Sequence, residues 1–307
     1  MALRTISTRA RRWTSALLLA APLAVLAQGN FQPSPDWPPN PTTLPAYGSA
    51  AVSACATGPG GELYVFQRAQ PPVLVLDRNG KLLRSWGSGE FTLPHGCRVD
   101  AQGNVWLTDS ADHRVMKFSP EGHKLLTLGV KGVSGDDPEH FNRPADVAFT
   151  PNGDVYIADG YGNSRVAQFN RDGRFIRAWG KKGTGPGEFN LPHSIRIDSR
   201  GRVAVADREN ARIQFFTTEG AFLEQWTHVG RPYGLHVTAD GRVVVSDGIA
   251  NTVSLYDPTG KKLASWGGKG TELGKFDLPH LLSVDEKGAL YVCEVGNKRV
   301  QKFIPLR

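Results

Sequence analysis

A chain of 307 residues with 36 lysines and arginines, 29 acidic residues and three cysteines limits the possible functions. Four arginines lie within the first twelve residues, and without them 32 basic residues face 29 acidic ones, a net charge of +3. So small an excess, with no basic run after the N-terminus, argues against nucleic-acid binding. The cysteines form no Cys-x-x-Cys pair, which excludes a thiolate metal site of that spacing.

The N-terminus has the features of a secretory signal peptide. A basic head precedes an apolar run over residues 13–26, and the small residue Ala27 follows. The run is too short to predict a membrane span, and no cysteine follows closely to carry a lipid anchor. We therefore expect residues 1–27 to be a signal peptide and the protein to be exported, periplasmic or secreted, without a stable membrane anchor.

Residues 28–45 are rich in proline and predict an extended N-terminal segment rather than a domain. The remaining residues, 46–307, are expected to form one domain. An odd number of cysteines leaves at least one thiol unpaired, and packing in the core is the preferred interpretation over a disulfide. The cysteines are Cys55, Cys97 and Cys293.

One pattern recurs six times in the predicted domain. A short apolar strand ends in an acidic residue, and after a turn a second strand opens with Arg or Thr before Val or Ile. Residues 203–207 before Arg212 are one copy, and the acidic positions are spaced by 40 to 50 residues, a period typical of propeller blades. The first copy is degenerate, with Gln67 at the strand end and Val73 opening the next strand. The acidic strand ends are Asp109, Asp159, Asp207, Asp247 and Glu294.

Each repeat is predicted to contain four short strands separated by tight turns. In the fourth repeat these cover residues 194–198, 203–207, 212–217 and 221–226, with Gly201 and Gly220 in the turns. No segment shows sustained helical periodicity, so the sequence predicts an all-β, six-bladed β-propeller. The last repeat ends after its third strand, at residues 299–305. We therefore expect Thr43 to Ser49 to supply the missing outer strand and close the ring.

Three repeats carry Leu-Pro-His where the innermost strand begins. These strand starts point at the central channel of a propeller, and alternate blades of a six-fold ring are related by a near three-fold axis. Three neutral imidazoles that meet on this axis match a catalytic zinc site. If Pro-His were only a requirement of the turn, the other three repeats would also carry it. The histidines are His95, His193 and His280, and the corresponding residues elsewhere are Ser53, Ala145 and Tyr233.

A second set of side chains is expected at the same mouth of the channel, directly after the acidic strand ends. Repeats one and four place Arg68 and Arg208 there, in blades that face each other across the ring. A guanidinium can hold a carboxylate by two parallel hydrogen bonds, so this pair predicts an anionic substrate. Tyr161 lies one position further along in repeat three. Either arginine alone would more often form a surface ion pair, and the nearby histidines favour a site.

These motifs together resemble the peptidyl-α-hydroxyglycine α-amidating lyases, the lyase domain of the peptidylglycine α-amidating enzyme. The similar stretches are residues 159–165, 191–194 and 206–212, and the resemblance extends from about residue 52 to residue 303. That family folds as a six-bladed propeller of NHL-type repeats. The implied reaction splits a peptidyl-α-hydroxyglycine into a peptide amide and glyoxylate, without hydrolysis.

The resemblance implies a role for each candidate residue. Arg68 and Arg208 would hold the substrate carboxylate and the charge that develops as the C–N bond breaks. Tyr161 would accept the hydroxyl proton if nearby positive charge depresses its pKa from about 10. Zinc would act on the substrate hydroxyl as a Lewis acid, and a monomer acting on a small molecule or peptide with a C-terminal α-hydroxyglycine is expected. The implied zinc ligands are His95, His193 and His280.

The sequence departs from this family at two positions. The family carries an aspartate after the third histidine that helps to bind calcium, whereas Leu281 stands here and argues against that site. Gly162 replaces the cysteine of a disulfide beside the tyrosine. No copper monooxygenase domain is seen in the sequence to make the hydroxyglycine, so we expect either that another protein supplies the substrate or that the substrate is not a peptide.

Two other functions remain open from the residues alone. A propeller of NHL type can act without catalysis, by binding a peptide or a wall component on one face. A metal-dependent lactonase or related hydrolase can use the same architecture, with metal ligands of the Asp, Glu and Asn types around the channel. The three histidines on alternate blades favour the lyase over both.

Overall fold

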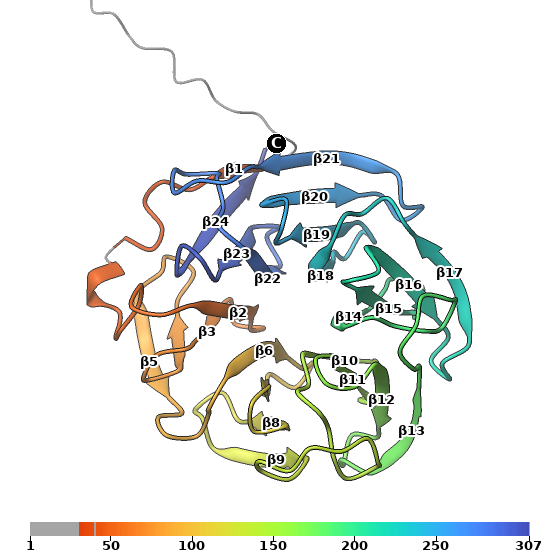
Figure 1. Cartoon of the computed structure of the whole chain (residues 1–307). Coiled ribbons are helices and arrows are strands. Elements are labelled where there is room, and N and C mark those ends of the chain that lie inside the picture. Colours follow the sequence, from red (N-terminus) through yellow and green to blue (C-terminus); the bar gives the residue numbers. More distant parts are fainter. Residues whose placement is uncertain (1–30, 40, 307) are drawn as a thin grey trace, which may run out of the picture.

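The computed structural model describes residues 31–39 and 41–306, which form six four-stranded sheets arranged around a central axis (Figure 1). Apart from one turn of 3₁₀ helix, η1 (Pro41–Thr43), the described secondary structure is entirely β, which confirms the predicted six-bladed propeller. The predicted signal peptide, residues 1–27, lies outside the described part of the chain. No helix in that part has the length and hydropathy needed to cross a membrane.

Five blades are built from consecutive strands that pair antiparallel, from the channel outward. Blade one contains β2 (Val52–Thr57), β3 (Leu63–Gln67), β4 (Val73–Leu76) and β5 (Leu82–Trp86), and blade two contains β6 (Pro94–Val99), β7 (Val105–Asp109), β8 (Arg114–Phe118) and β9 (Lys124–Leu128). Blade three contains β10 (Asp146–Phe149), β11 (Val155–Asp159), β12 (Arg165–Phe169) and β13 (Phe175–Trp179). Blade four contains β14 (Pro192–Ile197), β15 (Val203–Asp207), β16 (Arg212–Phe216) and β17 (Phe222–Trp226), and blade five contains β18 (Pro232–Val237), β19 (Val243–Asp247), β20 (Thr252–Tyr256) and β21 (Lys262–Gly267).

Blade six closes the ring with a strand from the other end of the described chain. It contains β22 (Pro279–Val284), β23 (Leu290–Glu294) and β24 (Arg299–Pro305), and its outer strand is β1 (Phe31–Pro33). Phe31 pairs with Pro305, and its ring stacks on Trp266 of blade five at 5.5 Å between centroids. The prediction that a segment near the N-terminus supplies the outer strand of blade six is therefore confirmed, and that strand lies in the proline-rich segment.

The predicted position of the closing strand, Thr43 to Ser49, is wrong. Ala46 and Gly48 have φ angles of 52° and 81°, and Pro45 has no amide hydrogen, so this segment cannot extend as a strand. It seals the seam between blades one and six instead. Leu44 is buried there, and the Tyr47 hydroxyl accepts a 2.6 Å hydrogen bond from the amide of Val300.

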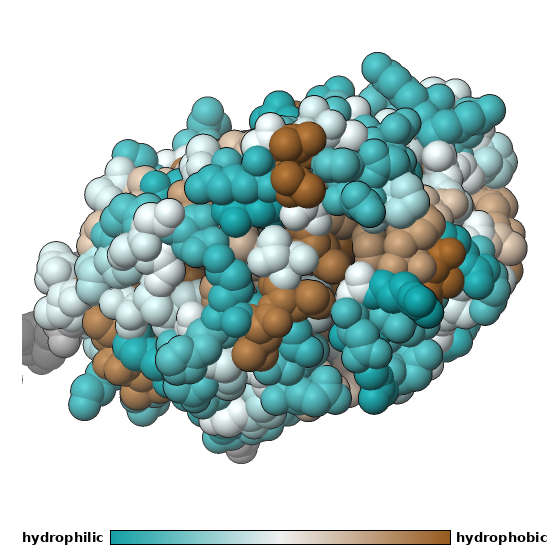
Figure 2. All heavy atoms as spheres, turned by 90° about the horizontal axis from the view of Figure 1, so that it is seen from below, coloured by the Kyte–Doolittle hydropathy of each residue, from teal (hydrophilic) through white to brown (hydrophobic). Residues whose placement is uncertain are grey.

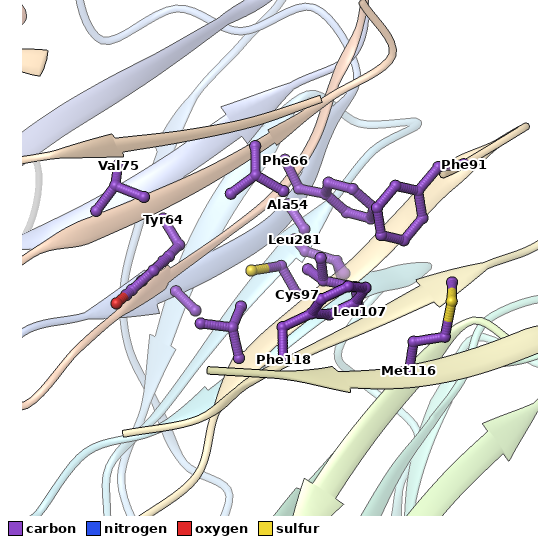
Figure 3. Close-up of a cluster of buried hydrophobic side chains, with 13 residues drawn as sticks. Ala54, Tyr64, Phe66, Val75, Phe91, Cys97, Leu107, Met116, Phe118 and Leu281 are labelled. Atoms are coloured by element: carbon purple, nitrogen blue, oxygen red, sulfur yellow. The ribbon is translucent and has the colours of Figure 1, made fainter. Parts of the chain in front are cut away.

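The core consists of separate apolar layers between neighbouring blades. The middle strands are buried on both faces, whereas the outer strands expose alternate side chains. The layer between blades one and two, drawn in Figure 3, packs Phe66 against Phe91 and includes Cys97. Each large side chain in such a layer contributes roughly 1.5–3 kcal/mol of stability. Seen edge-on in Figure 2, the surface is largely hydrophilic, with hydrophobic side chains in small scattered groups.

The three cysteines follow the prediction of core packing. Cys55, Cys97 and Cys293 are all buried free thiols. Cys55 and Cys293 belong to the layer between blades one and six, and Cys97 belongs to the layer between blades one and two. They therefore act as small apolar residues in the described fold.

The acidic residue at the end of the second strand anchors the loop that enters the same blade. In blade four, Asp207 accepts a 2.7 Å hydrogen bond from the amide of Asn190. It also forms an ion pair with Arg212, whose Nε lies 2.7 Å from Oδ2. Arg212 in turn donates to carbonyl groups of the loop that connects blades three and four. These carbonyls belong to Thr184, Gly185 and Glu188.

The same interaction explains why the acidic residue and the following arginine recur in the repeats. Asp159 pairs with Arg165, and Glu294 pairs with Arg299, in the corresponding positions of blades three and six. A carboxylate with 0 % exposure is stable only when hydrogen bonds and a cation compensate for its lost hydration. The carboxylate therefore fixes the loop from which the innermost strand starts.

Replacement of Asp207 by alanine is expected to destabilise the protein strongly. The change leaves Arg212 as a buried, unpaired cation, and breaking a buried pair in this way costs about 3–5 kcal/mol. Asp247→Ala is the matched control, because Asp247 binds only backbone amides and Thr252 stands where the arginine would be. That change is expected to cost about 1–3 kcal/mol. Equilibrium unfolding in urea measures both, and equal losses would contradict the role given to the ion pair.

Candidate functional site

The structure brings the three histidines together on the axis of the ring. His95, His193 and His280 are the second residues of β6, β14 and β22, and their exposed fractions are 1, 0 and 3 %. Their ring centroids lie 4.9, 4.8 and 4.8 Å apart, which is nearly an equilateral triangle. We refer to these residues as the histidine triad.

Two of the three loops before the triad hold an unusual backbone conformation. Leu191 and Leu278, each just before the Pro-His pair, have φ angles of 67° and 53°, in the left-handed region that costs a non-glycine residue about 1–2 kcal/mol. The amide after the acidic strand end donates to the leucine carbonyl in each case, from Arg208 to Leu191 and from Val295 to Leu278, at 3.1 Å. These bonds and the buried carboxylates hold the strand entrance that directs each histidine inward.

The neighbouring blade fixes the orientation of each imidazole. In every histidine of the triad, Nδ1 lies 2.6 to 2.7 Å from a backbone carbonyl oxygen of the next blade. A carbonyl can only accept a hydrogen bond, so Nδ1 carries the proton and Nε2 presents a lone pair. The pairs are His95 with Ala145, His193 with Tyr233, and His280 with Ser53.

The three Nε2 lone pairs converge with too few donors to satisfy them. The ligand nitrogens lie within 4.8 Å of one another, and the Tyr161 hydroxyl is 3.0 Å from Nε2 of His95 and 2.9 Å from Nε2 of His193. That hydroxyl has a single proton and can donate to one of them. No described residue donates to Nε2 of His280. A cation at this point would satisfy the surplus of acceptors.

Burial keeps the triad neutral. It lowers the pKa of His95 to about 3, and the positive charges of Arg68 and Arg208 act in the same direction. Burial also lowers the pKa of His193 and His280 well below the ordinary value. His280 and His95 add to this effect at His193, and His95 adds to it at His280. A neutral imidazole is the form that binds a metal ion.

For Tyr161 the balance differs from the sequence expectation. Burial raises the pKa of this hydroxyl, and the opposing effects of Arg208 and Arg68 are smaller. The cost of removing a phenolate from water exceeds the stabilisation from two partly hydrated guanidinium groups. In the protein without a bound cation, Tyr161 is therefore a neutral phenol.

The two predicted arginines lie on opposite sides of the triad. Arg208 donates from Nη1 to the Tyr161 hydroxyl at 3.4 Å, and its guanidinium lies 4.6 Å from the ring centroid of Tyr233. Its Nε pairs with Glu209 at 2.8 Å. Arg68 donates from Nε to the carbonyl of Pro94 at 3.2 Å, and no described carboxylate forms an ion pair with it. Its positive charge is therefore available to an anionic ligand.

Two further side chains complete this mouth of the channel, and the sequence analysis did not assign either a role. Tyr233 packs its ring 5.2 Å from that of His193, and the Arg143 guanidinium lies 5.4 Å from the ring centroid of Tyr161. A signal for them was present, since Arg-Pro replaces Leu-Pro in repeats three and five. The repeats without histidine therefore supply the wall and rim of the site.

The two departures from the amidating-lyase pattern have structural counterparts. The Leu281 side chain is fully buried in the apolar layer between blades one and two, where it offers no oxygen to a cation (Figure 3). A Cβ atom on Gly162 would lie 2.1 Å from the side chain of Asn142. Asn142 thus occupies the space that a cysteine side chain at position 162 would need.

The fold and its repeats define the class of protein as an NHL-repeat β-propeller. The family model described as NHL repeat matches residues 141–169 and 189–216, in blades three and four. The chain is 37% identical over 268 residues to the human NHL repeat-containing protein 3, which covers 80% of this chain and 77% of that protein. It is 31% identical over 314 residues to peptidyl-alpha-hydroxyglycine alpha-amidating lyase 2 of Drosophila melanogaster, and the match covers 86% of this chain and 74% of that protein.

The chain therefore belongs to the NHL-repeat family that includes NHL repeat-containing protein 3 and the peptidyl-alpha-hydroxyglycine alpha-amidating lyases. The mouse peptidyl-glycine alpha-amidating monooxygenase is 34% identical over 262 residues. This match covers 75% of the chain and 25% of the mouse protein. The resemblance stated from the motifs is thus confirmed over most of the sequence.

Solved structures with lower sequence identity share the fold. A streptogramin B lyase has a TM-score of 0.62 at 15% identity, covering 83% of this chain and 94% of its own. A gluconolactonase from Xanthomonas campestris has a TM-score of 0.64 at 15% identity, and the match covers 85% of this chain and 88% of the gluconolactonase. Similarity at this level concerns the propeller architecture alone.

The buried neutral triad predicts acid sensitivity of the metal-free protein. The lowered histidine pKa values mean that the unfolded chain binds protons below about pH 6.5 that the folded protein does not, so stability falls as the pH decreases. Each histidine is expected to contribute about 1.4 kcal/mol per pH unit between about pH 6 and pH 4. Urea unfolding of metal-free protein at several pH values measures this slope.

His193→Gln is expected to lower that slope by about 1.4 kcal/mol per pH unit, the contribution of one buried ring. The other two triad rings and His236, whose pKa burial also lowers, keep their contributions. The exposed His123→Gln variant controls for a change of the same residue type elsewhere. An unchanged slope in His193→Gln would show that the ring takes up its proton in the folded state.

Proposed function

We propose that the protein is a zinc-dependent lyase that cleaves the C–N bond of a peptidyl- or N-acyl-α-hydroxyglycine to give an amide and glyoxylate. The observation that carries this proposal is the convergence of three Nε2 lone pairs and the Tyr161 hydroxyl at one buried point. Arg68 and Arg208 add positive charge beside it. Relatives named as lyases for this reaction support the choice of substrate class.

The donor set fits zinc. Catalytic zinc sites commonly use three protein ligands and leave one position open, and a tetrahedral ion needs ligand nitrogens about 3.4 Å apart. The triad nitrogens, all within 4.8 Å of one another, approach that spacing, and the carbonyl bonds to Nδ1 already fix the ring orientations. When bound, zinc would supply Lewis-acid activation of the substrate hydroxyl.

The arginines would bind and orient the substrate carboxylate. No carboxylate of the described residues pairs with Arg68, and only its Nε donates within the described chain, so its two Nη atoms can form charge-assisted hydrogen bonds with the substrate. Arg208 lies across the triad, where it also contacts the Tyr161 hydroxyl. Glyoxylate retains the same carboxylate, so these contacts would persist as the C–N bond breaks.

Tyr161 would hold the proton that moves during the reaction. The substrate loses its hydroxyl proton, the electron pair of the C–N bond goes to the amide nitrogen, and that nitrogen takes up a proton as the carbonyl of glyoxylate forms. The Tyr161 oxygen is beside the Nε2 atoms, where the substrate hydroxyl would lie. Arg208 and Arg68 lower its pKa against the effect of burial, and a bound cation would add to that lowering.

The site supports the alternatives less well. A lactonase of the type considered above would place carboxylate and amide ligands around the axis. In residues 31–39 and 41–306, the histidine triad is the one cluster of three or more His, Cys, Asp or Glu side chains that could hold a metal ion. A binding propeller without catalysis needs no surplus of buried imidazole lone pairs. The human relative NHL repeat-containing protein 3 has a name that states no activity, so the experiment below also tests a binding propeller.

The proposal predicts zinc-dependent release of glyoxylate from an N-acyl-α-hydroxyglycine. The purified protein is expected to contain about one zinc per chain, to lose turnover when the zinc is removed, and to regain it when zinc is restored. His193→Ala is expected to abolish both zinc binding and turnover, because it removes one of three ligands. Metal analysis and a colorimetric glyoxylate assay measure the two quantities.

The outcomes separate the candidate functions. Zinc bound at the triad without glyoxylate release would mean that the site acts on another substrate. Calcium in place of zinc, with lactone hydrolysis, would favour the hydrolase. Neither metal nor turnover would leave a binding propeller.

Tyr161→Phe is expected to lower kcat by about 10²–10⁴-fold, the usual contribution of a positioned proton-transfer group. KM should change less than about threefold, since the ring and the arginines remain in place. Steady-state kinetics of the zinc-loaded protein provides the measurement, with Tyr47→Phe as the control for loss of a phenol far from the triad. An unchanged kcat would remove Tyr161 from the mechanism.

A further inference from the structure

The central channel contains a second polar cavity at the end opposite the histidine triad. Arg98, Arg196 and Ser283 each lie three positions after a triad histidine, which places them about 10 Å further along the innermost strands. The cavity here has a volume of about 200 Å³. Residues that line it include Thr57, Arg98, Phe149, Arg196, His236 and Ser283.

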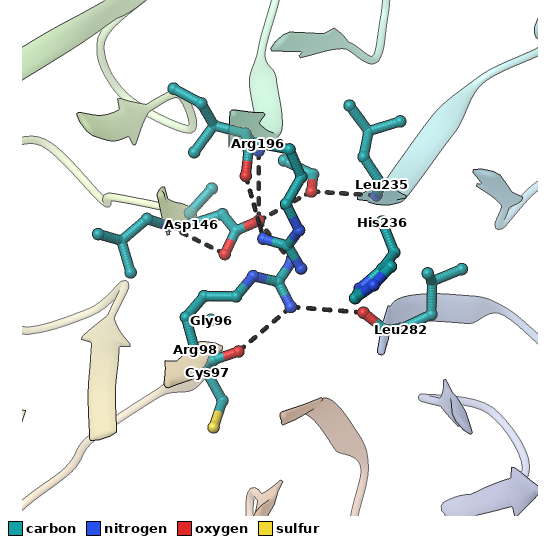
Figure 4. A network of polar contacts seen from close by, with 12 residues as sticks. Gly96, Cys97, Arg98, Asp146, Arg196, Leu235, His236 and Leu282 are labelled. Atoms are coloured by element: carbon teal, nitrogen blue, oxygen red, sulfur yellow. Dashed lines mark hydrogen bonds and ion pairs between the residues drawn. The ribbon is translucent and has the colours of Figure 1, made fainter. Parts of the chain in front are cut away.

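Two arginines in this cavity share one carboxylate. Asp146, which has 0 % exposure, pairs with Nη2 of Arg98 at 2.6 Å and with Nη1 of Arg196 at 3.6 Å (Figure 4). Its Oδ2 atom also accepts a 2.8 Å hydrogen bond from the Ser194 hydroxyl and a 3.3 Å bond from the amide of Ile195. The carboxylate is thus fully occupied, and one positive charge remains uncompensated.

The guanidinium groups also retain donors without partners. Nε of Arg98 is buried and has no hydrogen-bond acceptor in the described chain. Arg196 uses Nη1 for the carbonyl of Ile195, and its Nε and Nη2 atoms have no acceptor among the described residues. Burying an unpaired charge and unsatisfied donors is costly, so a ligand that supplies both negative charge and acceptors would be stabilised here.

Neutral donors surround these arginines. The Nδ1 atom of His236 accepts a hydrogen bond from the amide of Val284 at 3.4 Å, so the proton of the neutral ring lies on Nε2. Burial, Arg196 and Arg98 all lower the pKa of His236 and keep the ring neutral. The Thr57 hydroxyl donates to the carbonyl of Val284 at 3.3 Å, which leaves the Ser283 hydroxyl, 3.3 Å from it on the cavity wall, to donate to a ligand. The lining is therefore rich in donors, in contrast to the triad.

We propose that this cavity is an anion-binding site that takes a small organic carboxylate, held by the Nε and Nη2 atoms of Arg196 and by the Ser283 hydroxyl. One uncompensated charge matches a monoanion, and the guanidinium fork matches the two oxygens of a carboxylate. Phe149 and the apolar side chains beside it can cover the short carbon chain of such a ligand. The site is independent of the lyase proposal, because it uses none of the triad or its arginines.

Calorimetric titration with sodium acetate tests the proposal. Because Arg68 and Arg208 could also bind acetate, the titration is made in the Arg68→Gln/Arg208→Gln double variant. Saturable binding with one acetate per chain is expected there, and acetamide, the neutral molecule of similar shape, is expected not to bind. Absence of acetate binding in this background would overturn the proposal.

Adding Arg196→Gln to that background is expected to weaken acetate binding at least tenfold, because the uncompensated charge is lost. Unchanged affinity would place the acetate elsewhere and also overturn the proposal. Circular dichroism checks that this variant folds. Should it fail to fold, Ser283→Ala, which removes only the hydroxyl, is expected to weaken acetate binding about threefold to tenfold through loss of one hydrogen bond. Unchanged affinity in Ser283→Ala would then exclude the cavity.

Discussion

The architecture depends on a buried carboxylate at the end of the second strand of a blade. In blades three, four and six it binds the amide of the loop that enters the blade and the arginine that opens the third strand. The arginine then binds carbonyl groups of the same loop. These bonds fix the loop from which the innermost strand of the blade starts. In blades four and six, the second residue of that strand is a histidine of the triad.

The ring uses its six blades as two interlaced sets of three. Blades two, four and six contribute the imidazoles, and blades three, five and one contribute the carbonyl oxygens that orient them. Each ring is therefore fixed by a backbone atom of another blade rather than by its own loop. This arrangement fixes the rings although no carboxylate of the described residues contacts the triad, and it leaves the charge of Arg68 without an ion-pair partner among those residues.

The two ends of the channel have opposite hydrogen-bonding character. At the triad, buried lone pairs outnumber donors, and the local chemistry favours a cation. At Arg98 and Arg196, donors and positive charge outnumber acceptors, and the local chemistry favours an anion. In both places the imbalance is buried, where an unsatisfied polar group costs more than at the surface.

The sequence by itself determined the six blades and the triad, because both depend on spacing that can be counted along the chain. Repeat period gives the number of blades, and the occurrence of Leu-Pro-His in alternate repeats gives a three-fold arrangement. The opposed positions of Arg68 and Arg208 follow from the same symmetry.

Only the tertiary structure decided what depends on contacts between repeats. The closing strand is Phe31–Pro33 because three residues pair with β24, a match too short to give a pattern. The pKa of Tyr161 rises because burial outweighs two nearby charges, and Asp146 joins Arg98 and Arg196 because three blades meet at the axis. These effects depend on residues that are far apart in the sequence and follow no repeating pattern, so they cannot be predicted from residue spacing.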